Sequence, residues 1–460
     1  MELERLIYKD LLTWKSENTG RVLELQGARQ VGKTYILKKF AKENFRHCLY
    51  ISMAEESGKD FLNCLEEAAK WTPGTPRPRY HVLKEAFRLY DQKFVDGGDT
   101  VIVIDEIQES ARVYNQIRTL AREFDSYVIV TGSYLGKALQ KEFFLPAGDT
   151  DKLQMGTLSF EEFLAALGEG ELYRNAALYG GSQPDVYESL KGYFETYQCI
   201  GGYPAVVSYY AEHQDIAKCE SLIGRLMDIF TSESIRYFTD ITDVDIFPKL
   251  FQAIAILMLR EKQGVRELPT ELSRIIYQEE SGRTTKKMVN RAISWLQESH
   301  IIGYASKSTD CDHLQIKENC RYYFLDLGIA YHFLKATGAE PRQVRGLLAE
   351  NYVYLCLRGR LQKQKELAGN APWFALYQKT KGELDFFARS LIDYKNYGIE
   401  VKSTDAAAKT AMKLLEDGKL DYLYLLKGDT KGGISRDGKV LTVPLYLVDR
   451  ISFSLGKRCG

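Results

Sequence analysis

A glycine-rich segment, Gly27-Ala28-Arg29-Gln30-Val31-Gly32-Lys33-Thr34, constrains the fold of this chain more than any other feature. It fits the pattern G-x-x-x-x-G-K-[ST] completely. An apolar run containing Val22 and Leu25 precedes it, and a helix-like segment from Tyr35 to Asn44 follows. This strand-loop-helix context is the one that the motif requires, so the sequence predicts a nucleotide-binding loop.

Each residue type in this loop has a physical reason to be there. Glycines let the backbone approach phosphates closely, while successive N–H groups and the helix N-terminus hold the anionic oxygens. Lys33 reaches the β- and γ-phosphates, and Thr34 ligates Mg²⁺. The alternative, a glycine-rich turn with a capping threonine, does not need the complete pattern. The expected cofactors are ATP and Mg²⁺, and the expected nucleotide-binding residues are Gly27, Ala28, Arg29, Gln30, Val31, Gly32, Lys33, Thr34 and Tyr35.

Two later runs predict central strands of a parallel sheet. Residues 101–104 (VIVI) are apolar on both faces, as a buried parallel strand must be, and Asp105-Glu106 follow directly. Residues 127–130 end in Thr131-Gly132-Ser133. Strands that alternate with helices and end in polar residues indicate an α/β fold whose ligand crevice lies along the carboxyl edge of the sheet.

Length and net charge limit the number of domains and the kinds of partner to expect. With 460 residues and 45% apolar composition, we expect two to four domains. Lys+Arg and Asp+Glu both number 62, so a nucleic-acid or lipid partner must be held by local patches. No secretory signal is visible, and the longest apolar run, near Leu250 to Leu259, is far below the roughly 20 residues that span a bilayer. A soluble, cytoplasmic protein without a membrane partner is expected.

The predicted domains are a P-loop ATPase domain over 1–167, a helical lid or connector over 168–260, a winged helix over 261–325 and an α/β domain over 326–460. For the winged helix, the pattern predicts a helix from Leu268 to Gln278, a second from Thr284 to Glu298, and two short strands. Basic residues near the start of the second helix could meet DNA phosphates: Arg283, Lys286, Lys287 and Arg291. Winged helices also dock proteins, and this alternative stays open.

The last predicted domain contains acids in an ordered set. Residues two apart in a strand share a face, so Glu400 and Lys402 are expected to point together. With Asp385 on a neighbouring strand, Glu400 would form a Mg²⁺ site, while Lys402 positions water and Glu350 is a further ligand or orienting residue. The alternative is that these charged residues decorate half-exposed strands.

Taken together, these motifs resemble a large prokaryotic family of AAA+-type ATPases with a fused winged helix and a C-terminal PD-(D/E)xK nuclease-like, or restriction-endonuclease-like, α/β domain. The matching residues include Gly27 to Thr34, VIVIDEIQ around Asp105, VTGS ending at Ser133, and the segments TLSFEEF, GGYP, YFLDLG, GLLAENYV, GELDFF and IEVKS. The resemblance implies that Asp105 holds Mg²⁺ through water and that Glu106 polarises the attacking water. It also implies that Thr131 or Ser133 senses the γ-phosphate. The expected catalytic residues are thus Lys33, Asp105, Glu106 and Ser133.

One departure from the family pattern bears on rate. Relatives usually carry Gly-Arg before the LSFEEF segment, whereas this chain has Gly148-Asp149. An arginine supplied to a phosphate is worth about 10³ to 10⁵ in rate, so its loss predicts slow turnover. Arg118 and Arg122 are possible substitutes.

The resulting expectation is an ATP-binding protein with slow Mg²⁺-dependent ATPase activity. Its nucleotide state would reposition the winged helix and the nuclease-like domain, with DNA as a candidate partner. The alternative is an ATP-gated regulatory or docking switch with an inactive nuclease fold. An arginine acting in trans would require an oligomer.

Overall fold

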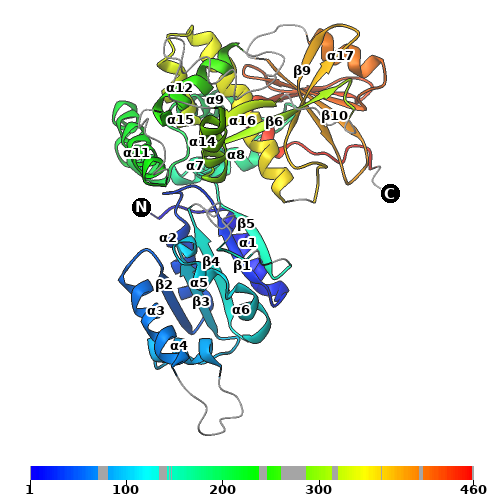
Figure 1. Ribbon diagram of the computed structural model, residues 1–460. Coiled ribbons are helices and arrows are strands. Elements are labelled where there is room, and N and C mark those ends of the chain that lie inside the picture. The colour runs from blue at the N-terminus through cyan, green and yellow to red at the C-terminus, as the bar shows by residue number, and fades with distance from the viewer. Residues whose placement is uncertain are drawn as a thin grey trace. The chain divides into compact units, whose positions relative to one another are not determined.

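The computed structural model describes residues 2–70, 81–133, 142–144, 146, 148–237, 246–260, 286–312, 320–363, 365–402 and 408–457. The chain divides into two compact units, residues 4–156 and residues 157–460 (Figure 1). We refer to them as the loop unit, which contains the glycine-rich loop, and the large unit.

The loop unit alternates strands and helices as the sequence predicts. Its elements are α1 (Ile7–Glu17), β1 (Val22–Gln26), α2 (Lys33–Asn44), β2 (His47–Ser52), α3 (Glu56–Ala69), α4 (Val82–Tyr90), β3 (Thr100–Asp105), η1 (Ile107–Glu109), α5 (Ala111–Tyr114), α6 (Ile117–Glu123), β4 (Tyr127–Gly132) and β5 (Thr150–Gln154).

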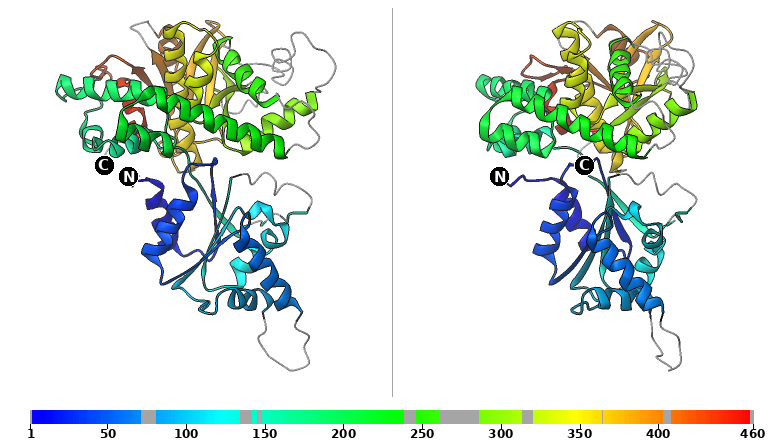
Figure 2. Two further views of the ribbon diagram at one scale, coloured as in Figure 1. Left: turned by 90° about the vertical axis from the view of Figure 1, so that its left-hand side faces the viewer. Right: turned by 60° about the vertical axis from the view of Figure 1, so that its left-hand side comes forward.

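The five strands of the loop unit form one parallel sheet in the order β2-β3-β4-β1-β5. β3 is buried at every position, which explains why its sequence is apolar on both faces. Its Ile102 and Ile104 pack with α3 and α4 residues such as Phe61 and Phe87. Figure 2 shows α1, in dark blue, on one side of this sheet and the lighter-blue helices on the other. The predicted parallel α/β sheet is confirmed.

The large unit begins with helices and then adds strands. Its helices are α7 (Phe160–Ala166), α8 (Gly170–Asn175), α9 (Pro184–Ile200), α10 (Pro204–His213), α11 (Ile216–Tyr237), α12 (Ile246–Arg260), α14 (Lys286–Glu298), α15 (Leu327–Lys335), α16 (Pro341–Gln362), α17 (Lys409–Glu416) and η3 (Leu445–Arg450). Its strands are β6 (Ile302–Thr309), β7 (Cys320–Phe324), β8 (Trp373–Tyr377), β9 (Gly382–Arg389), β10 (Asn396–Lys402), β11 (Tyr422–Lys427), β12 (Gly433–Ile434) and β13 (Val440–Pro444).

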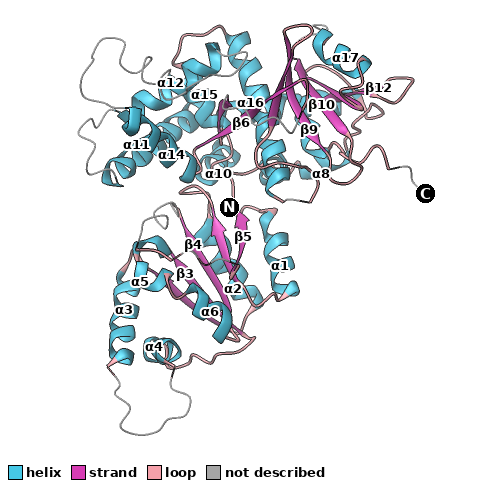
Figure 3. Cartoon of the chain, turned by 45° about the vertical axis from the view of Figure 1, so that its right-hand side comes forward, coloured by secondary structure: helices cyan, strands magenta, loops and turns pink. Residues whose placement is uncertain are grey.

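These strands form one eight-stranded mixed sheet in the order β12-β13-β11-β10-β9-β8-β6-β7. Figure 3 shows its strands in magenta, with α17 beside β9 and β10. The prediction assigned β6 and β7 to a separate winged helix over 261–325, and this assignment is wrong for both strands. β6 pairs in parallel with β8 from Ser306 to Thr309, which makes the two strands an extension of the C-terminal sheet.

Parts of the predicted winged helix lie outside the described residues. These are the first helix, Leu268 to Gln278, and Arg283. The second predicted helix is present as α14, although the side chain of Lys286 is not described.

Three of the sequence motifs meet at one buried point of the large unit. Gly202 donates its N–H to Asp326 Oδ2 at 2.8 Å and accepts a hydrogen bond from the N–H of Leu158 at 2.7 Å. Asp326 also caps α15 by accepting from Ile329 N–H at 3.1 Å. The predicted capping box of Ser159 and Glu162 is confirmed immediately after Leu158. The GGYP, YFLDLG and TLSFEEF segments therefore hold the helices of this unit together.

Among the described residues, no helix combines the length and the apolar character needed to cross a membrane.

Candidate functional site

The backbone of the glycine-rich loop has the shape that its glycines allow. Gly27 has φ 155°, and a Cβ there would lie only 2.2 Å from the carbonyl oxygen of Met155. Gly32 has φ 96° and forms the N-cap of α2. Gly27 has no room for a side chain, and the positive φ of Gly32 disfavours one, so the loop presents bare backbone before α2.

Lys33 folds back over this loop. Its Nζ donates to the carbonyl oxygens of Gly27 and Ala28, both at 2.8 Å, and the residue is 6% exposed. The ammonium group is therefore positioned within the loop that is expected to hold phosphates.

The two predicted Mg²⁺ ligands of the loop unit lie side by side. Thr34 Oγ1 donates to Asp105 Oδ2 at 2.7 Å, although the two residues are 71 positions apart. Asp105 is 4% exposed, and its Oδ1 accepts the N–H of Glu106 at 2.9 Å. A hydroxyl and a carboxylate are oxygen ligands that suit Mg²⁺, so these residues fit the metal that the loop implies.

Glu106 follows β3 in a left-handed conformation with φ 49°, which is uncommon for a residue other than glycine. Its Oε2 accepts from Ser133 Oγ at 3.1 Å, from Ser133 N–H at 3.4 Å and from Gln108 Nε2 at 2.5 Å. The carboxylate is thus held at the carboxyl edge of the sheet by two neighbours.

Thr131 and Ser133, the two expected phosphate sensors, differ in their hydrogen-bond partners. The Thr131 hydroxyl, on β4, donates to Leu25 O of the neighbouring strand β1 at 2.8 Å, and the residue is fully buried. Ser133 instead contacts Glu106. The polar site therefore combines Lys33, Thr34, Asp105, Glu106 and Ser133.

Sequence reasoning missed two residues at this site. Tyr50 on β2 donates its hydroxyl to Asp105 Oδ2 at 2.5 Å, and burial together with this bond raises the pKa of Tyr50. Arg5 donates to Val31 O and to Gly156 O, both at 2.7 Å, and so ties the loop to the end of β5. Neither residue belongs to a sequence motif.

Asp149 lies at the other edge of the sheet. Thr150, the next residue, pairs with Val22 at the start of β1, whereas the glycine-rich loop follows the end of β1. Four strand steps separate the edges by roughly 13 Å. An arginine at this position would therefore not reach a phosphate bound at the loop of the same chain.

Arg118 and Arg122 are positioned by the same carboxylate. Their Nε atoms donate to Asp149 at 3.2 Å and 3.0 Å. The hydrogen bond from Arg122, with help from Arg118, holds the pKa of Asp149 below its usual value. These arginines lie at the amino edge and do not substitute for a missing group at the loop.

The predicted acids of the large unit are brought together. Lys402 Nζ and Glu400 Oε1 are 2.6 Å apart, which confirms that the two side chains share a face of β10. Asp385 Oδ2 accepts the N–H of Val401 at 2.7 Å, and Glu400 Oε2 accepts the N–H of Asp385 at 3.5 Å. Glu350 Oε1 accepts from the hydroxyl of Tyr323 at 2.5 Å.

A bulge in β9 accompanies this arrangement. β8 advances two residues from Trp373 to Ala375, while β9 covers three from Leu384 to Phe387. The extra residue falls next to Asp385. Side chains alternate between the two faces of a regular strand. A bulge interrupts this alternation and redirects the side chains beside it.

Burial raises the pKa of the Asp385 carboxyl well above its usual range, and Glu400 and Glu350 add to this effect. Burial also raises the pKa of Glu400, although Lys402 opposes it. Among the residues that the structure describes, no three acidic, imidazole or thiol side chains are arranged to hold a metal ion. The predicted nuclease Mg²⁺ site therefore has its residues in place but not an open ligand set.

The candidate DNA contacts are only partly described. Lys287 and Arg291 are exposed on α14, next to the buried Val289 and Ala292 of the same helix.

Comparisons with known proteins support the assignment of the loop unit. Residues 19–164 match the family model of an AAA domain, and residues 191–340 match that of a domain of unknown function, DUF8612. An uncharacterised protein of Haemophilus influenzae is 22% identical over 337 residues, which cover 70% of this chain and 72% of that protein.

Two solved structures are distantly similar to this chain. The Walker-type ATPase of Pyrococcus abyssi has a TM-score of 0.44 at 14% identity, over 72% of this chain and 96% of that one. The ORC1 protein of Aeropyrum pernix, solved in complex with DNA, has a TM-score of 0.29 at 13% identity, over 76% and 93%. Both scores are too low to support an argument about function. The family match and the loop geometry together support an AAA-type P-loop domain over residues 19–164.

Proposed function

We propose that the chain binds ATP with Mg²⁺ at the glycine-rich loop and hydrolyses it, and that the nucleotide state of the loop unit controls the large unit. The single observation that carries the proposal is the 2.7 Å contact between Thr34 Oγ1 and Asp105 Oδ2. Burying a carboxylate without a nearby cation is costly, so a 4%-exposed Asp105 beside a hydroxyl suits a bound divalent ion.

The residues at the loop have separate roles in phosphoryl transfer. Backbone N–H groups at the start of α2 bind phosphate oxygens, and Lys33 transfers its hydrogen bonds from the Gly27 and Ala28 carbonyls to them. Thr34 and Asp105 would hold Mg²⁺, which would neutralise the charge that develops on the phosphate oxygens.

Glu106 orients and polarises the attacking water as a general base. Ser133 and Gln108 hold its carboxylate, so the group is positioned before substrate arrives. Within one chain, Asp149 does not affect phosphoryl transfer, because it lies at the sheet edge opposite the loop.

The large unit is the proposed responder. DNA is its candidate partner through the basic side of α14, where Lys287 is exposed, and a docking protein is the alternative. Neutral net charge means that any DNA contact depends on this local patch.

An ATPase assay with and without single- and double-stranded DNA tests the proposal. Mg²⁺-dependent phosphate release that Glu106→Gln removes supports the enzyme. DNA stimulation that is lost in Lys287→Glu, but not in Lys409→Glu on α17, supports the DNA partner. Binding of ATP without any phosphate release would favour the non-catalytic switch.

A further inference from the structure

A group of polar and charged side chains is enclosed within the large unit. It includes three residues that the acid pattern did not contain, Arg321 and Tyr323 on β7 and Glu383 on β9. We call the group the C-terminal charge cluster. Its members are Arg321, Tyr323, Glu350, Glu383, Asp385, Glu400 and Lys402.

Arg321 fills the space between two carboxylates of this cluster. Its side chain is 7% exposed; Nη1 lies 3.5 Å from Glu350 Oε1, and Nη2 forms an ion pair with Glu383. The guanidinium also lies over the ring of Phe374, 4.3 Å from its centroid. Aromatic stacking and two ion pairs fix this cation in place.

The hydrogen bonding around the Arg321 side chain is incomplete. Its Nε and the Oε2 of Glu383 are buried and have no hydrogen-bond partner among the described residues. Buried polar atoms of this kind carry an energetic cost. The guanidinium is therefore held there by charge rather than by a complete set of hydrogen bonds.

The remaining carboxylates are also occupied. Lys402 neutralises Glu400 at 2.6 Å, and Asp385 Oδ2 accepts the N–H of Val401 at 2.7 Å. A divalent ion needs several open oxygens at about 2.0–2.6 Å, and it is repelled by cations in contact with those oxygens. The donor set present does not fit Mg²⁺.

We propose that Arg321 and Lys402 are the built-in counter-cations of the C-terminal charge cluster and stand in the place of a metal ion. The cluster accordingly has no divalent-metal site in the native chain, and it does not support metal-dependent cleavage of nucleic acid. Removing the charge of Arg321 leaves Glu350 and Glu383 unpaired and converts the cluster into a divalent-cation site. This inference is independent of ATP binding at the loop.

A Mn²⁺ binding experiment tests the proposal directly. Binding is measured as the loss of the electron paramagnetic resonance signal of the free ion. The full chain is used without nucleotide and with Asp105→Asn, so that the loop site does not contribute. In this background we expect no ion that depends on Asp385. Arg321→Gln should gain about one Mn²⁺ per chain, and a further Asp385→Asn should remove it. Arg321→Lys, which keeps the charge, should gain none.

Two results overturn the proposal. One is a Mn²⁺ ion bound with Arg321 intact and lost in Asp385→Asn. The other is an Arg321→Gln chain that keeps its unfolding transition and still binds no additional ion. If Arg321→Gln does not fold, the Asp385→Asn comparison with Arg321 intact decides alone: no difference in bound Mn²⁺ supports the proposal, and a lost ion contradicts it.

Discussion

The hydroxyl of Tyr50 donates to the same oxygen of Asp105 that accepts from Thr34, at 2.5 Å and 2.7 Å. Tyr50 reaches this carboxylate because β2 pairs with β3 in a register that places Ser52 opposite Asp105. The side chain also lies beneath Lys38 Nζ, 4.2 Å from the ring centroid. Tyr50 is thus a positioning residue for the proposed Mg²⁺ ligand.

Tyr50→Phe should weaken Mg²⁺-dependent ATP binding by about tenfold, since hydrogen-bond partners of metal ligands typically contribute this much. Nucleotide binding measured without Mg²⁺ should change little, and titration calorimetry with and without the metal separates the two. Tyr8→Phe is the matched control. The hydroxyl of Tyr8, on α1, also donates to a carboxylate, but this carboxylate belongs to Glu43 and is not a proposed Mg²⁺ ligand. Equal losses with and without Mg²⁺ would show that Tyr50 acts only on the fold.

Glu106→Gln should reduce phosphate release by about 10² to 10⁴ while leaving ATP binding intact, because the amide cannot accept the proton of the attacking water. Glu109→Gln, an exposed residue of the following 3₁₀ turn, should retain the native rate. A Glu106→Gln chain that hydrolyses ATP at the native rate would remove the assigned role.

Gly202→Ala should destabilise the large unit by about 1–3 kcal/mol, because its Cβ would lie 2.1 Å from the carbonyl oxygen of Leu158. Gly192→Ala in α9 has open space around it and should be neutral or stabilising by up to about 1 kcal/mol. Urea unfolding of the two variants measures the difference. Similar midpoints for both would contradict the close packing of Gly202 against Leu158.

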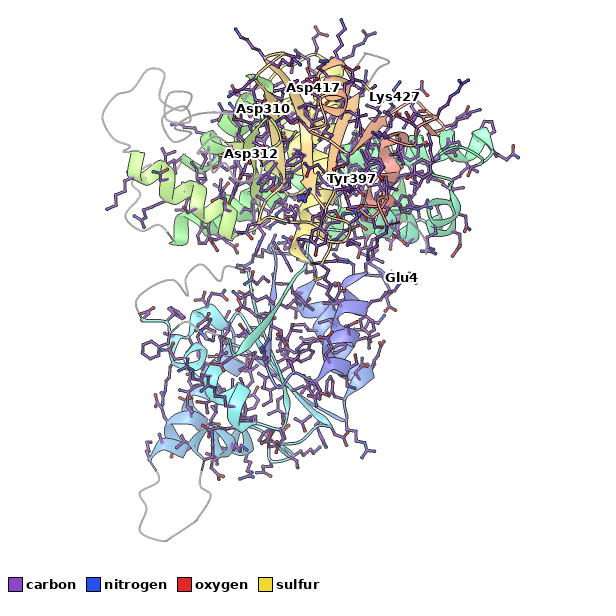
Figure 4. All side chains as sticks on the ribbon, turned by 90° about the vertical axis from the view of Figure 1, so that its right-hand side faces the viewer. Glu4, Asp310, Asp312, Tyr397, Asp417 and Lys427 are labelled. Carbon is purple, nitrogen blue, oxygen red and sulfur yellow. The ribbon has the colours of Figure 1, made fainter. Side chains whose placement is uncertain are left out.

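Asp417 provides a test of acid stability. The hydroxyl of Tyr377, then Lys379 and Lys413, hold the pKa of Asp417 down to about 2, against an ordinary value of 3.8. A depressed carboxyl pKa stabilises the fold at pH above 3.8, and this contribution is lost as the pH falls from 3.8 toward 2. Figure 4 shows Asp417 and Asp310 labelled at the same end of the large unit.

Asp417→Asn should therefore show a shallower loss of stability between pH 4 and pH 2 than the native chain. Unfolding by urea at several pH values across this interval measures the slope. Asp429→Asn is the control, since its carboxylate is 90% exposed, and it should keep the native slope. An unchanged slope in Asp417→Asn would contradict the assigned ion pairs.

The residues of the nucleotide site that could be predicted are those in local motifs. Gly27 to Thr34 are contiguous. Asp105 ends a strand that its own apolar pattern reveals, and Glu106 and Ser133 directly follow such strands. Tyr50 could not be predicted, because its contact with Asp105 depends on the lateral pairing of β2 with β3. Local pattern predicts where a strand ends but not which side chain of its neighbour reaches it.

The C-terminal charge cluster illustrates the same limit. The shared face of Glu400 and Lys402 follows from strand alternation and is confirmed. Arg321 was missed because its strand was predicted to belong to a winged helix. The pairing of β6 with β8 joins β7 to the sheet that carries Glu383, and this long-range register has no local sequence signal.

ATP-dependent stabilisation of the Lys33→Ala chain tests the central claim most directly. In the native chain, ATP with Mg²⁺ at 100 times its dissociation constant should stabilise the fold by about 2.7 kcal/mol, measured as a rise in melting temperature. Lys42→Ala, on the exposed side of the same helix, should keep this rise. Lys33→Ala should lose it, because the phosphates lose their ammonium partner. A native chain that shows no shift with ATP and Mg²⁺, or a Lys33→Ala chain that keeps the full shift, would contradict nucleotide binding at this loop.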